Sequence, residues 1–424
     1  MEGWIELSLK EIGWFRGAGV NKLLSPEEQS VYLINYMDVY THWRIYFNTR
    51  YQLVTAKKRE IEEANLLVGD ILFTPSSEKP IDIGHAGVVM EDMPNCLYSY
   101  HLIRYRLFDR NKFDLTYLSY LLNSDEVQKH FVSRASGSGI RYTLSLNDFR
   151  SVKIRVPEKA VQIKIANILS KVDEAIESVQ NSIVAAERLK KSLMQNLLTG
   201  KMKPDGTFRT PEEFYTDEKF GKVPVCWEVK RVQDFGEVQT GKTPPTEEPD
   251  VFSDNENGFM FITPGDVGSS KYIEHTERYV SEKGMGYSYH LPKGAVCEVC
   301  IGSTIGKIGI TTTGCCSNQQ ITSVIVNEEH DAEYLYYAML NRREHFKSVA
   351  GINATPQINK SGYSKYKVLC PKDKKEQATI AERIRSIDTE INNKQYKNTI
   401  LEKLKKTLMQ NLLTGKMIID DNIK

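Results

Sequence analysis

The sequence predicts an α+β protein in which two long antiparallel coiled-coil helices separate two repeated mixed α/β domains. Three observations predict this fold class. One segment recurs 215 positions later, both of its copies carry a heptad pattern, and short β-rich runs with Gly-rich turns precede each copy. The 424 residues also exceed what one core usually holds, since domains typically have about 100–200 residues.

Composition limits the function classes. Lys plus Arg number 56 against 55 Asp plus Glu, so the net charge of +1 excludes a uniformly basic nucleic-acid-binding coat but allows local basic patches. No run of 18 apolar residues occurs and the first ten residues lack an apolar signal core, so we expect neither a membrane span nor secretion. Seven cysteines without framework spacing are expected to be reduced thiols of a cytoplasmic protein.

The internal repeat sets the domain boundaries. Ser192–Met202 returns as Thr407–Met417, and extending the match backward without a gap gives 20 identities in 41 positions. Weaker matches in front of it, such as Trp4–Gly13 with Trp227–Gly236, indicate two half-chains of one design. The predicted parts are a first domain, a central helix, a linker, a second domain and a C-terminal helix, at residues 1–160, 161–202, 203–225, 226–374 and 375–424.

Each recurring segment predicts one long helix. Apolar residues in the first copy alternate steps of four and three and then shift phase by one position: Ile165, Leu169, Val172, Ile176, Val179, Ile183, Ala186, then Leu189, Leu193, Leu197. The second copy continues the pattern through Lys394, Asn398 and Leu404. Gly200 and Gly415 are the expected C′ caps. Each helix has about 38 residues, or roughly 57 Å, and its narrow apolar stripe needs a partner.

The simplest partner of each helix is the other copy. Antiparallel pairing would place the two domains at opposite ends of a rod, whereas the alternative has each helix lying on its own domain. Lys394 and Asn398 would then form either a register-setting polar layer or a wetter stretch of the seam. The helix ends are predicted to stay exposed and to bind a common kind of partner surface, unless duplication alone explains their similarity: Leu193, Met194, Leu197, Leu198, Leu408, Met409, Leu412 and Leu413.

Several loops of the two domains combine basic, amide and aromatic residues. Asn and Gln can pair with adenine, Arg and Lys can bond guanine, and neighbouring Gly lets backbone approach phosphate. The alternative for any single cation is a solvated surface charge. The candidate DNA-binding residues are Lys57, Arg59, His101, Arg134 and Arg141 in the first domain, and Lys271, Lys307, Asn318, Gln319, Gln320, Gln357 and Lys360 in the second.

Motifs for catalysis or metal binding fail on physical grounds. Gly236–Thr243 has the letters of a phosphate-binding loop, but Pro244 and Pro245 prevent the helix that would hold phosphate. Cys297 and Cys300 lie on a predicted strand, where residues three apart face opposite ways, so thiols are favoured over a zinc site. We find no nucleophile elbow, His-Glu-x-x-His motif or convincing carboxylate cluster.

The repeated motifs resemble a known family. Gly221–Val229, the pattern of Pro, Gln and Ile-Ala at 157–166 and again at 371–381, and Leu-Leu-Thr-Gly-Lys at 197–201 and 412–416 are similar to the DNA specificity subunit of type I restriction–modification enzymes. The resemblance implies two target-recognition domains, each reading half of a split asymmetric site in double-stranded DNA, and paired helices that act as a ruler. It also implies a non-catalytic subunit rather than the alternative, a coiled-coil interaction scaffold without DNA specificity.

The same resemblance implies partners and the location of cofactors. The helices would dock two methyltransferase subunits, through which motor/nuclease subunits join. S-adenosylmethionine, ATP and Mg²⁺ would belong to those partners, with no cofactor or metal in this subunit. Two departures between the halves indicate that the domains read different half-sites: Asp70 becomes Ala295, and Thr74–Gly84 replaces the shorter Gly302–Lys307.

Overall fold

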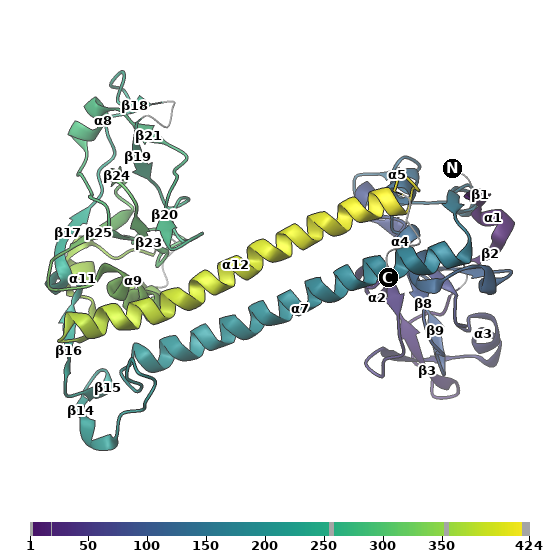
Figure 1. Ribbon diagram of the computed structural model, residues 1–424, viewed down its shortest axis with the longest axis horizontal. Helices are drawn as coiled ribbons and strands as arrows, with labels where there is room; N and C mark the ends of the chain where they lie inside the picture. The colour runs from purple at the N-terminus through teal and green to yellow at the C-terminus, as the bar shows by residue number, and fades with distance from the viewer. Residues whose placement is uncertain (1–2, 18, 254–257, 352–355, 418–424) are drawn as a thin grey trace. The chain divides into compact units, whose positions relative to one another are not determined.

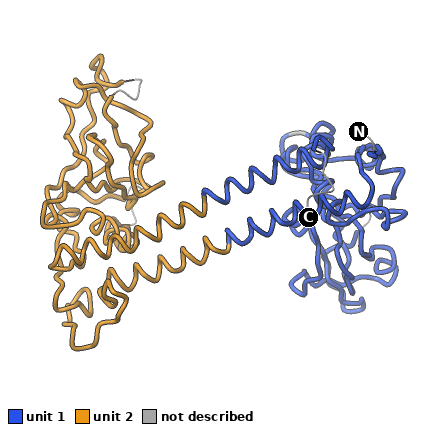
Figure 2. The backbone as a smooth tube through the Cα atoms, in the orientation of Figure 1, with its two compact units in different colours: residues 1–180, 396–424 blue, residues 181–395 orange. Residues whose placement is uncertain are grey.

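The computed structural model describes residues 3–17, 19–253, 258–351 and 356–417. The chain forms two compact units, of residues 1–180 with 396–424 and of residues 181–395 (Figures 1 and 2). Each unit therefore contains one globular domain together with parts of both long helices, α7 (Lys159–Leu197) and α12 (Lys374–Leu412). Among the described residues, no helix has a stretch long and apolar enough to cross a bilayer.

The first domain is built on a five-stranded sheet of order β2-β10-β6-β8-β4, beside a three-stranded sheet β5-β3-β9. Strands β1 and β13 pair at the ends of the domain, and β11-β12-β7 form a small sheet. The elements are β1 Ile5–Ser8, α1 Leu9–Ile12, β2 Gly13–Arg16, β3 Gln29–Ile34, α2 Tyr36–Thr41, β4 Arg44–Ile45, β5 Gln52–Ala56, α3 Lys58–Glu63, β6 Ile71–Phe73, β7 Ser76–Ser77, β8 Ala86–Val89, β9 Cys96–Tyr98, β10 Ile103–Leu107, α4 Leu115–Leu121, α5 Asp125–Val132, β11 Ser136–Ser138, β12 Arg141–Thr143, α6 Leu146–Arg150 and β13 Lys153–Val156.

The second domain repeats this topology. Its main sheet has the order β17-β25-β22-β23-β20, its second sheet the order β18-β21-β19-β24, and β16 pairs with β26. The elements are β16 Trp227–Arg231, β17 Gly236–Thr240, β18 Phe252–Ser253, β19 Phe259–Ile262, β20 Tyr272–Ile273, β21 Tyr279–Val280, α8 Glu282–Tyr287, β22 Val296–Val299, β23 Ile308–Thr311, β24 Cys315–Ser317, β25 Ile321–Val326, α9 Ala332–Asn341, α10 Arg343–Val349, α11 Lys360–Lys365 and β26 Lys367–Pro371.

The two domains also share the direction of each unusual strand pair. The pairs β4·β8 and β20·β23 are parallel, as are β3·β9 and β19·β24, while the other pairs of the two main sheets are antiparallel. The weak sequence matches of the repeat therefore correspond to one fold used twice. This confirms the predicted repetition of a mixed α/β domain.

Equivalent buried amides attach each domain to its long helix. Gln162 of α7 accepts a hydrogen bond from the backbone N–H of Asp114 at 2.9 Å and donates to the carbonyl of Pro157. In the second domain, Gln377 of α12 accepts from the N–H of Asp331 at 3.0 Å and donates to Pro371. Both side chains are almost fully buried, so the repeated Gln serves the repeated domain–helix junction.

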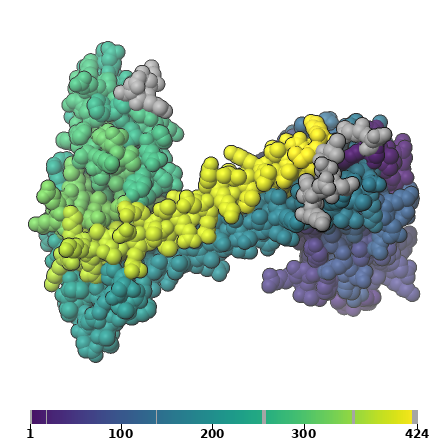
Figure 3. All heavy atoms as spheres, viewed as in Figure 1, coloured from purple at the N-terminus to yellow at the C-terminus, as the bar shows by residue number. Residues whose placement is uncertain are grey.

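The long helices pair antiparallel within each unit. In unit 1, Ile165 and Leu169 near the start of α7 share a core with Leu412 and Leu413 at the end of α12. Figure 3 shows the yellow end of α12 lying over the first domain. In unit 2, the roles are reversed, since the end of α7 packs with the start of α12 around Ile384. The structure thus confirms the antiparallel arrangement. The alternative, in which each helix lies on its own domain, holds for the first turns of each helix, because each helix begins on its own domain and ends on the other.

Ion pairs at equivalent positions fix this antiparallel register. Asp173 of α7 binds Lys405 of α12 at 2.7 Å and accepts the hydroxyl of Tyr120 at 2.6 Å. Asp388 binds Lys190 and accepts the hydroxyl of Tyr337 at 2.6 Å in unit 2. The seam residues Lys394 and Asn398 instead contact Glu390 and Glu402 on their own helix, four residues away.

The helix ends match their predicted caps, while the linker is more ordered than predicted. Gly200 and Gly415 have φ of +69° and +71°, the left-handed conformation that ends a helix at C′. Residues 203–225 contain a β-hairpin of β14 (Phe214–Asp217) and β15 (Gly221–Pro224). Arg209 from this segment binds Glu376 and stacks on Trp227, which holds the hairpin against the second domain.

Candidate nucleic-acid interface

Both domains build the same polar edge beside the main sheet. The loop after the central strand (β6 or β22) pairs with the segment that precedes a short helix (α6 or α11). In the first domain Ser77 pairs with Tyr142, and in the second Ile301 bridges to Gln357. Because the scaffold is common and the loop sequences differ, equivalent places in the two domains present different chemistry.

In the first domain this edge carries a glycine-rich hairpin. A Cβ on Gly137 would lie 2.1 Å from the carbonyl oxygen of Arg141, so the β11–β12 turn requires glycine there. The turn presents Ile140 with 86% of its surface exposed, next to the exposed guanidinium of Arg141. Arg141 donates to the hydroxyl of Ser76 at 3.1 Å, which steadies the cation on the edge.

His101 lies close to the same cations. Burial lowers the pKa of His101, and the charges of Lys22 and Arg141 lower it further. The imidazole is therefore neutral at pH 7 and has one donor and one acceptor nitrogen. The ring of Tyr100 lies beside it, tilted by 38°, with the ring centroids 3.9 Å apart. We call Lys22, Tyr100, His101, Ile140 and Arg141 the basic edge.

The other candidates of the first domain lie elsewhere. Lys57 precedes the first turn of α3, and Arg59 on the same helix binds Glu63 at 2.9 Å. Arg134 follows α5 and donates to the carbonyl of His130 at 3.3 Å. The structure thus brings together His101 and Arg141, and adds Lys22, which the sequence pattern did not single out.

In the second domain the edge is rich in amides. Asn318 donates to the side-chain oxygen of Gln320 at 3.1 Å, and the carbonyl of Gln320 accepts from the N–H of Cys300. Gln357 reaches the same place through its bridge to Ile301. We call Asn318, Gln319, Gln320 and Gln357 the amide cluster. The order of the chain separates Gln357 from the other three, yet the fold brings all four together.

The segment that imitates a phosphate-binding loop lies beside the amide cluster. Gly236–Thr240 is strand β17, and Thr243 donates to the side-chain oxygen of Gln319 at 2.6 Å. A Cβ on Gly241 would lie 2.1 Å from the carbonyl of Asn318, so the close approach of the two segments requires this glycine. Lys242 is exposed there. Sequence reasoning assigned no role to Lys242 and Thr243, although the adjacent Pro244 and Pro245 indicate an exposed loop at this position.

Of the lysine candidates of the second domain, one is exposed and two line the same cavity. Lys360 is exposed on the first turn of α11, which Asn359 caps. Lys307 lines a cavity of about 570 Å³. Lys271 is largely buried and binds Glu333 at 3.3 Å.

Lys271 is part of the domain–helix junction. Burial lowers its pKa, although the charge of Glu333 and a hydrogen bond to it oppose the change. Burial alone would raise the pKa of Glu333, but the hydrogen bond from Tyr272 and the Lys271 charge lower it. Arg385 of α12 binds Glu333 at 3.2 Å as well. Lys271 therefore differs from the exposed DNA contact that the sequence predicted, because it is enclosed where α12 meets the domain.

The prediction of exposed apolar helix ends is wrong. Met194, Leu197, Leu198, Leu412 and Leu413 are at most 8% exposed, within the cores of units 2 and 1, while Leu193, Leu408 and Met409 are partly buried against the same cores. The physical reason is the antiparallel pairing, which ends each helix on a globular domain of the same fold. The common surface that these residues meet is thus inside the chain itself.

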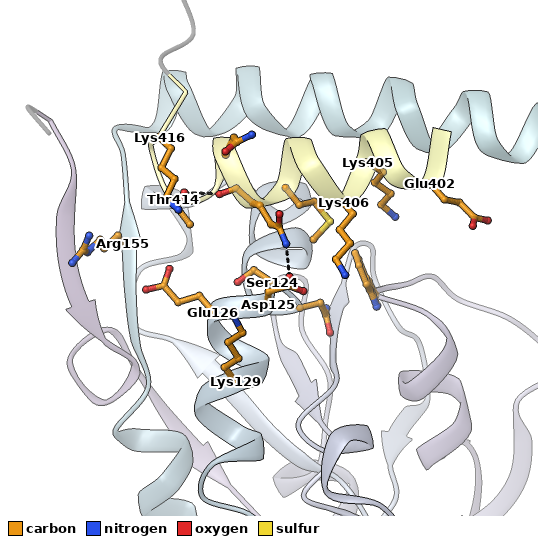
Figure 4. A pocket seen from close by; sticks show the side chains of 15 residues that line it. Ser124, Asp125, Glu126, Lys129, Arg155, Glu402, Lys405, Lys406, Thr414 and Lys416 are labelled. Carbon is orange, nitrogen blue, oxygen red and sulfur yellow. Dashed lines mark hydrogen bonds between the residues drawn. The ribbon is translucent and has the colours of Figure 1, made fainter. Parts of the chain in front are cut away.

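Other apolar side chains of the long helices remain exposed. Leu189 and Leu404, which are equivalent in the repeat, are 48% and 43% exposed. Tyr396 and Ile400 lie near Leu404 on α12 and are exposed too. A cavity of about 870 Å³ lies further along, between α5 and the end of α12, where Gln410 donates to Asp125 at 2.8 Å (Figure 4). In that view Lys406 points toward Asp125.

The cysteine pattern belongs to the core. Cys297, Cys300, Cys315 and Cys316 are fully buried, and burial raises the pKa of Cys316 to about 11 and that of Cys297 to about 12. Thiols with such values remain protonated and unreactive at neutral pH. Over the part of the chain that the structure describes, no three His, Cys, Asp or Glu side chains are grouped to hold a metal ion.

Comparison with known proteins identifies the family. The family described as type I restriction modification DNA specificity domain matches residues 1–188 and 224–402. The type I restriction enzyme MjaVIII specificity subunit of Methanocaldococcus jannaschii is 26% identical over 87% of this chain and 83% of its own length. The HindI specificity subunit of Haemophilus influenzae is 24% identical over 71% and 77%.

Solved structures share the fold. The S subunit of a type I restriction–modification system from M. genitalium matches with a TM-score of 0.57 and 14% identity over 96% of both chains. The HsdS subunit from Thermoanaerobacter tengcongensis matches with a TM-score of 0.51 and 16% identity over 98% of both. Two repeated domains, two paired helices and a family match over most of the chain agree. This chain belongs to the type I restriction–modification DNA specificity family, whose subunits recognise a DNA sequence.

Proposed function

We propose that this chain is the non-catalytic subunit that selects the target of a type I restriction–modification complex in the cytoplasm. The first domain reads one half of a split asymmetric site in double-stranded DNA and the second domain reads the other half. The single observation that carries this proposal is that both domains form the same polar edge beside the main sheet but present different side chains on it. The basic edge offers Arg141 and neutral His101, whereas the amide cluster offers Asn and Gln.

These groups suit different bases. A guanidinium such as that of Arg141 can donate two hydrogen bonds to guanine, and a carboxamide can exchange two with adenine. Two domains with unlike edges would read unlike half-sites, and the composite target would therefore be asymmetric. A net charge of +1 is compatible with this role when partner subunits supply part of the phosphate contact.

The partners bind to the helices in this proposal. The exposed side chains of Leu189 and Leu404 occupy equivalent positions, so two copies of one partner can make equivalent contacts. Two methyltransferase subunits that carry S-adenosylmethionine fit this requirement. The motor/nuclease subunits, with ATP and Mg²⁺, would join through them, and this subunit would need no cofactor of its own.

Methylation-aware sequencing of the host genome tests the proposal most directly. The expected result is methylated adenine in one split motif, which disappears when the gene for this chain is deleted. Footprinting of the assembled methyltransferase should then show protection of both half-sites. A complex that protects DNA without regard to sequence would favour the interaction scaffold instead.

Domain exchange tests which part reads which half. Replacing Met1–Val156 with the matching domain of a relative should change one half-site and leave the other intact, because each domain has its own edge. Sequencing the methylated motif of the chimaera measures this. Simultaneous loss of both half-sites in a folded, active complex would contradict modular reading.

A further inference from the structure

The cavity of about 570 Å³ in unit 2 is lined by an excess of cations. Three of them are already paired, since Lys190 binds Asp388 while Lys271 and Arg385 share Glu333. The remaining two, Lys307 and Arg343, have no hydrogen bond or ion pair with any described residue, and the buried Nε of Arg343 has no acceptor. An unpaired buried guanidinium nitrogen is costly unless an anion accepts from it.

Two glycines make room for these cations. Gly268 has φ +89°, and a Cβ there would lie 3.0 Å from Cγ of Lys307, whose stem crosses the glycine. Gly306 has φ +79°, and its Cβ would lie 3.1 Å from Cγ of Arg343 and 3.6 Å from Cγ of Lys347. The backbone therefore adopts the conformations that leave space for the stems of Lys307 and Arg343, which both line the cavity. We call Gly268, Ser269, Ser270, Lys307 and Arg343 the cationic cleft.

The cationic cleft adjoins the amide cluster through one short loop. Gly302 begins this loop and donates to the carbonyl of Pro356, next to Gln357. Gly306 ends it, and Lys307 follows immediately. The loop is held as a tight turn by the hydrogen bond from the N–H of Ile305 to the carbonyl of Gly302 at 3.2 Å. Amides that can read base edges and unpaired cations thus lie at opposite ends of the same turn.

We propose that the cationic cleft binds one phosphodiester of the DNA backbone beside the half-site that the second domain reads, with Lys307 and Arg343 as its charged contacts and the hydroxyl of Ser269 as a further donor. The hydroxyl of Ser270 is already occupied, because it donates to the carbonyl of Tyr272. This inference rests on the proposed function and deepens it. Contacts to phosphate fix the register of a protein on the duplex, and base contacts supply the specificity. The cleft would hold the amide cluster at a set position along the groove. Glu274, a lining carboxylate that has no ion pair with any described residue, opposes the binding.

The test uses the full-length chain in its complex with the methyltransferase subunits, and a duplex that carries the methylated motif. Dissociation constants are measured over a range of salt concentrations for K307A, R343A and E274Q, with K293A as a control for an exposed lysine of the same unit outside the cleft. We expect K307A and R343A each to weaken binding roughly 10-fold at low salt. Each should reduce the slope of log affinity against log salt by about 1, with unchanged preference for the motif. E274Q should strengthen binding, and K293A should leave it unchanged.

A single neutral methylphosphonate, moved along the backbone of the second half-site, locates the phosphate. At one position the methylphosphonate should weaken DNA binding by the wild-type complex. At that position it should cause little further loss of affinity in R343A, because the variant already lacks the contact to this phosphate. The inference would be overturned if K307A and R343A kept the wild-type affinity and salt slope, or if either variant changed the base preference. It would also be overturned if the cleft bound free inorganic phosphate but made no contribution to DNA binding. Absence of specific binding by the wild-type complex would instead refute the proposed function. Thermal melting of each variant identifies misfolding.

Discussion

Individual residues of the second domain show how burial alters charge. Glu298 lies on the central strand β22, is almost completely buried, and has one carboxyl oxygen without a hydrogen-bond partner. Burial raises its pKa to about 8, while the neighbouring hydroxyl of Tyr363 and the charge of Arg343 act in the opposite direction. The carboxyl is therefore mostly protonated at neutral pH. Its sequence neighbours give no sign of this, because the strand pattern places Glu298 among apolar residues.

The pH dependence of Glu298 has a definite sign. Its pKa is higher in the folded state than the usual 4.5, so the folded chain binds the extra proton and stability falls as pH rises from about 4.5 to about 8. Substituting E298Q should leave the melting temperature near the wild-type value at pH 5. At pH 9 it should stabilise the protein by about 2 kcal/mol, because no buried charge forms. Calorimetry at the two pH values measures the difference, and an equal effect at both would contradict this account.

At the scale of elements, the paired helices carry two kinds of residue that heptad spacing does not distinguish. Leu197 and Leu189 both fit the predicted seam, yet Leu197 is fully buried and Leu189 is half exposed. The sequence predicted two helices of about 38 residues, and each has 39. It could not predict which apolar positions are covered, because the covering residues come from globular loops and from the other half of the chain.

The exposed positions give a prediction for the partners. L189D and L404D should each weaken binding of one methyltransferase subunit at least 10-fold, because a carboxylate would replace apolar contact area. Both side chains are half exposed, so the melting temperature of the isolated chain should change little. Analytical ultracentrifugation of the mixtures measures the stoichiometry. Intact 2:1 assembly with the double variant would show that the partners bind elsewhere.

The partly buried ion pairs give a second prediction at this scale. Removing Asp388 leaves Lys190 and the hydroxyl of Tyr337 without their acceptor, so D388A should destabilise the chain by about 2 kcal/mol. D173A should cost about as much for the same reason in unit 1. E390A, which breaks an exposed pair on one helix, serves as the control at about 0.5 kcal/mol or less. Denaturant titration compares the three, and equal small losses would refute a structural role for the pairs.

At the scale of the whole molecule, the repeat was the strongest signal in the sequence. Identities such as Asp173 with Asp388 and Gln162 with Gln377 predicted one design used twice, and each pair makes equivalent contacts. For the basic edge and the amide cluster, the sequence predicted candidate residues but not which of them lie together. His101 and Arg141 are 40 positions apart, and Gln357 is 37 positions from Gln320, so only the folded sheet brings them together.

The ruler hypothesis belongs to this scale. Inserting about one heptad at equivalent places in α7 and α12 should change the length of the spacer between the half-sites and leave both half-sites unaltered, since the reading edges lie in the domains. Insertion in only one helix should impair folding, because it shifts Asp173 and Asp388 out of register with their lysines. Methylome sequencing reports the spacer. Altered half-site bases with an unaltered spacer would contradict the ruler.

The composition of unit 1 has a consequence for biosynthesis. Its core needs Leu412 and Leu413, which leave the ribosome after all of unit 2 has been translated. At typical elongation rates the first domain waits roughly 10 to 50 s for these leucines. Until then the part of the core around Ile165 and Leu169 that these two leucines cover is exposed to solvent. A premature stop codon before Tyr396 would yield a polypeptide prone to proteolysis.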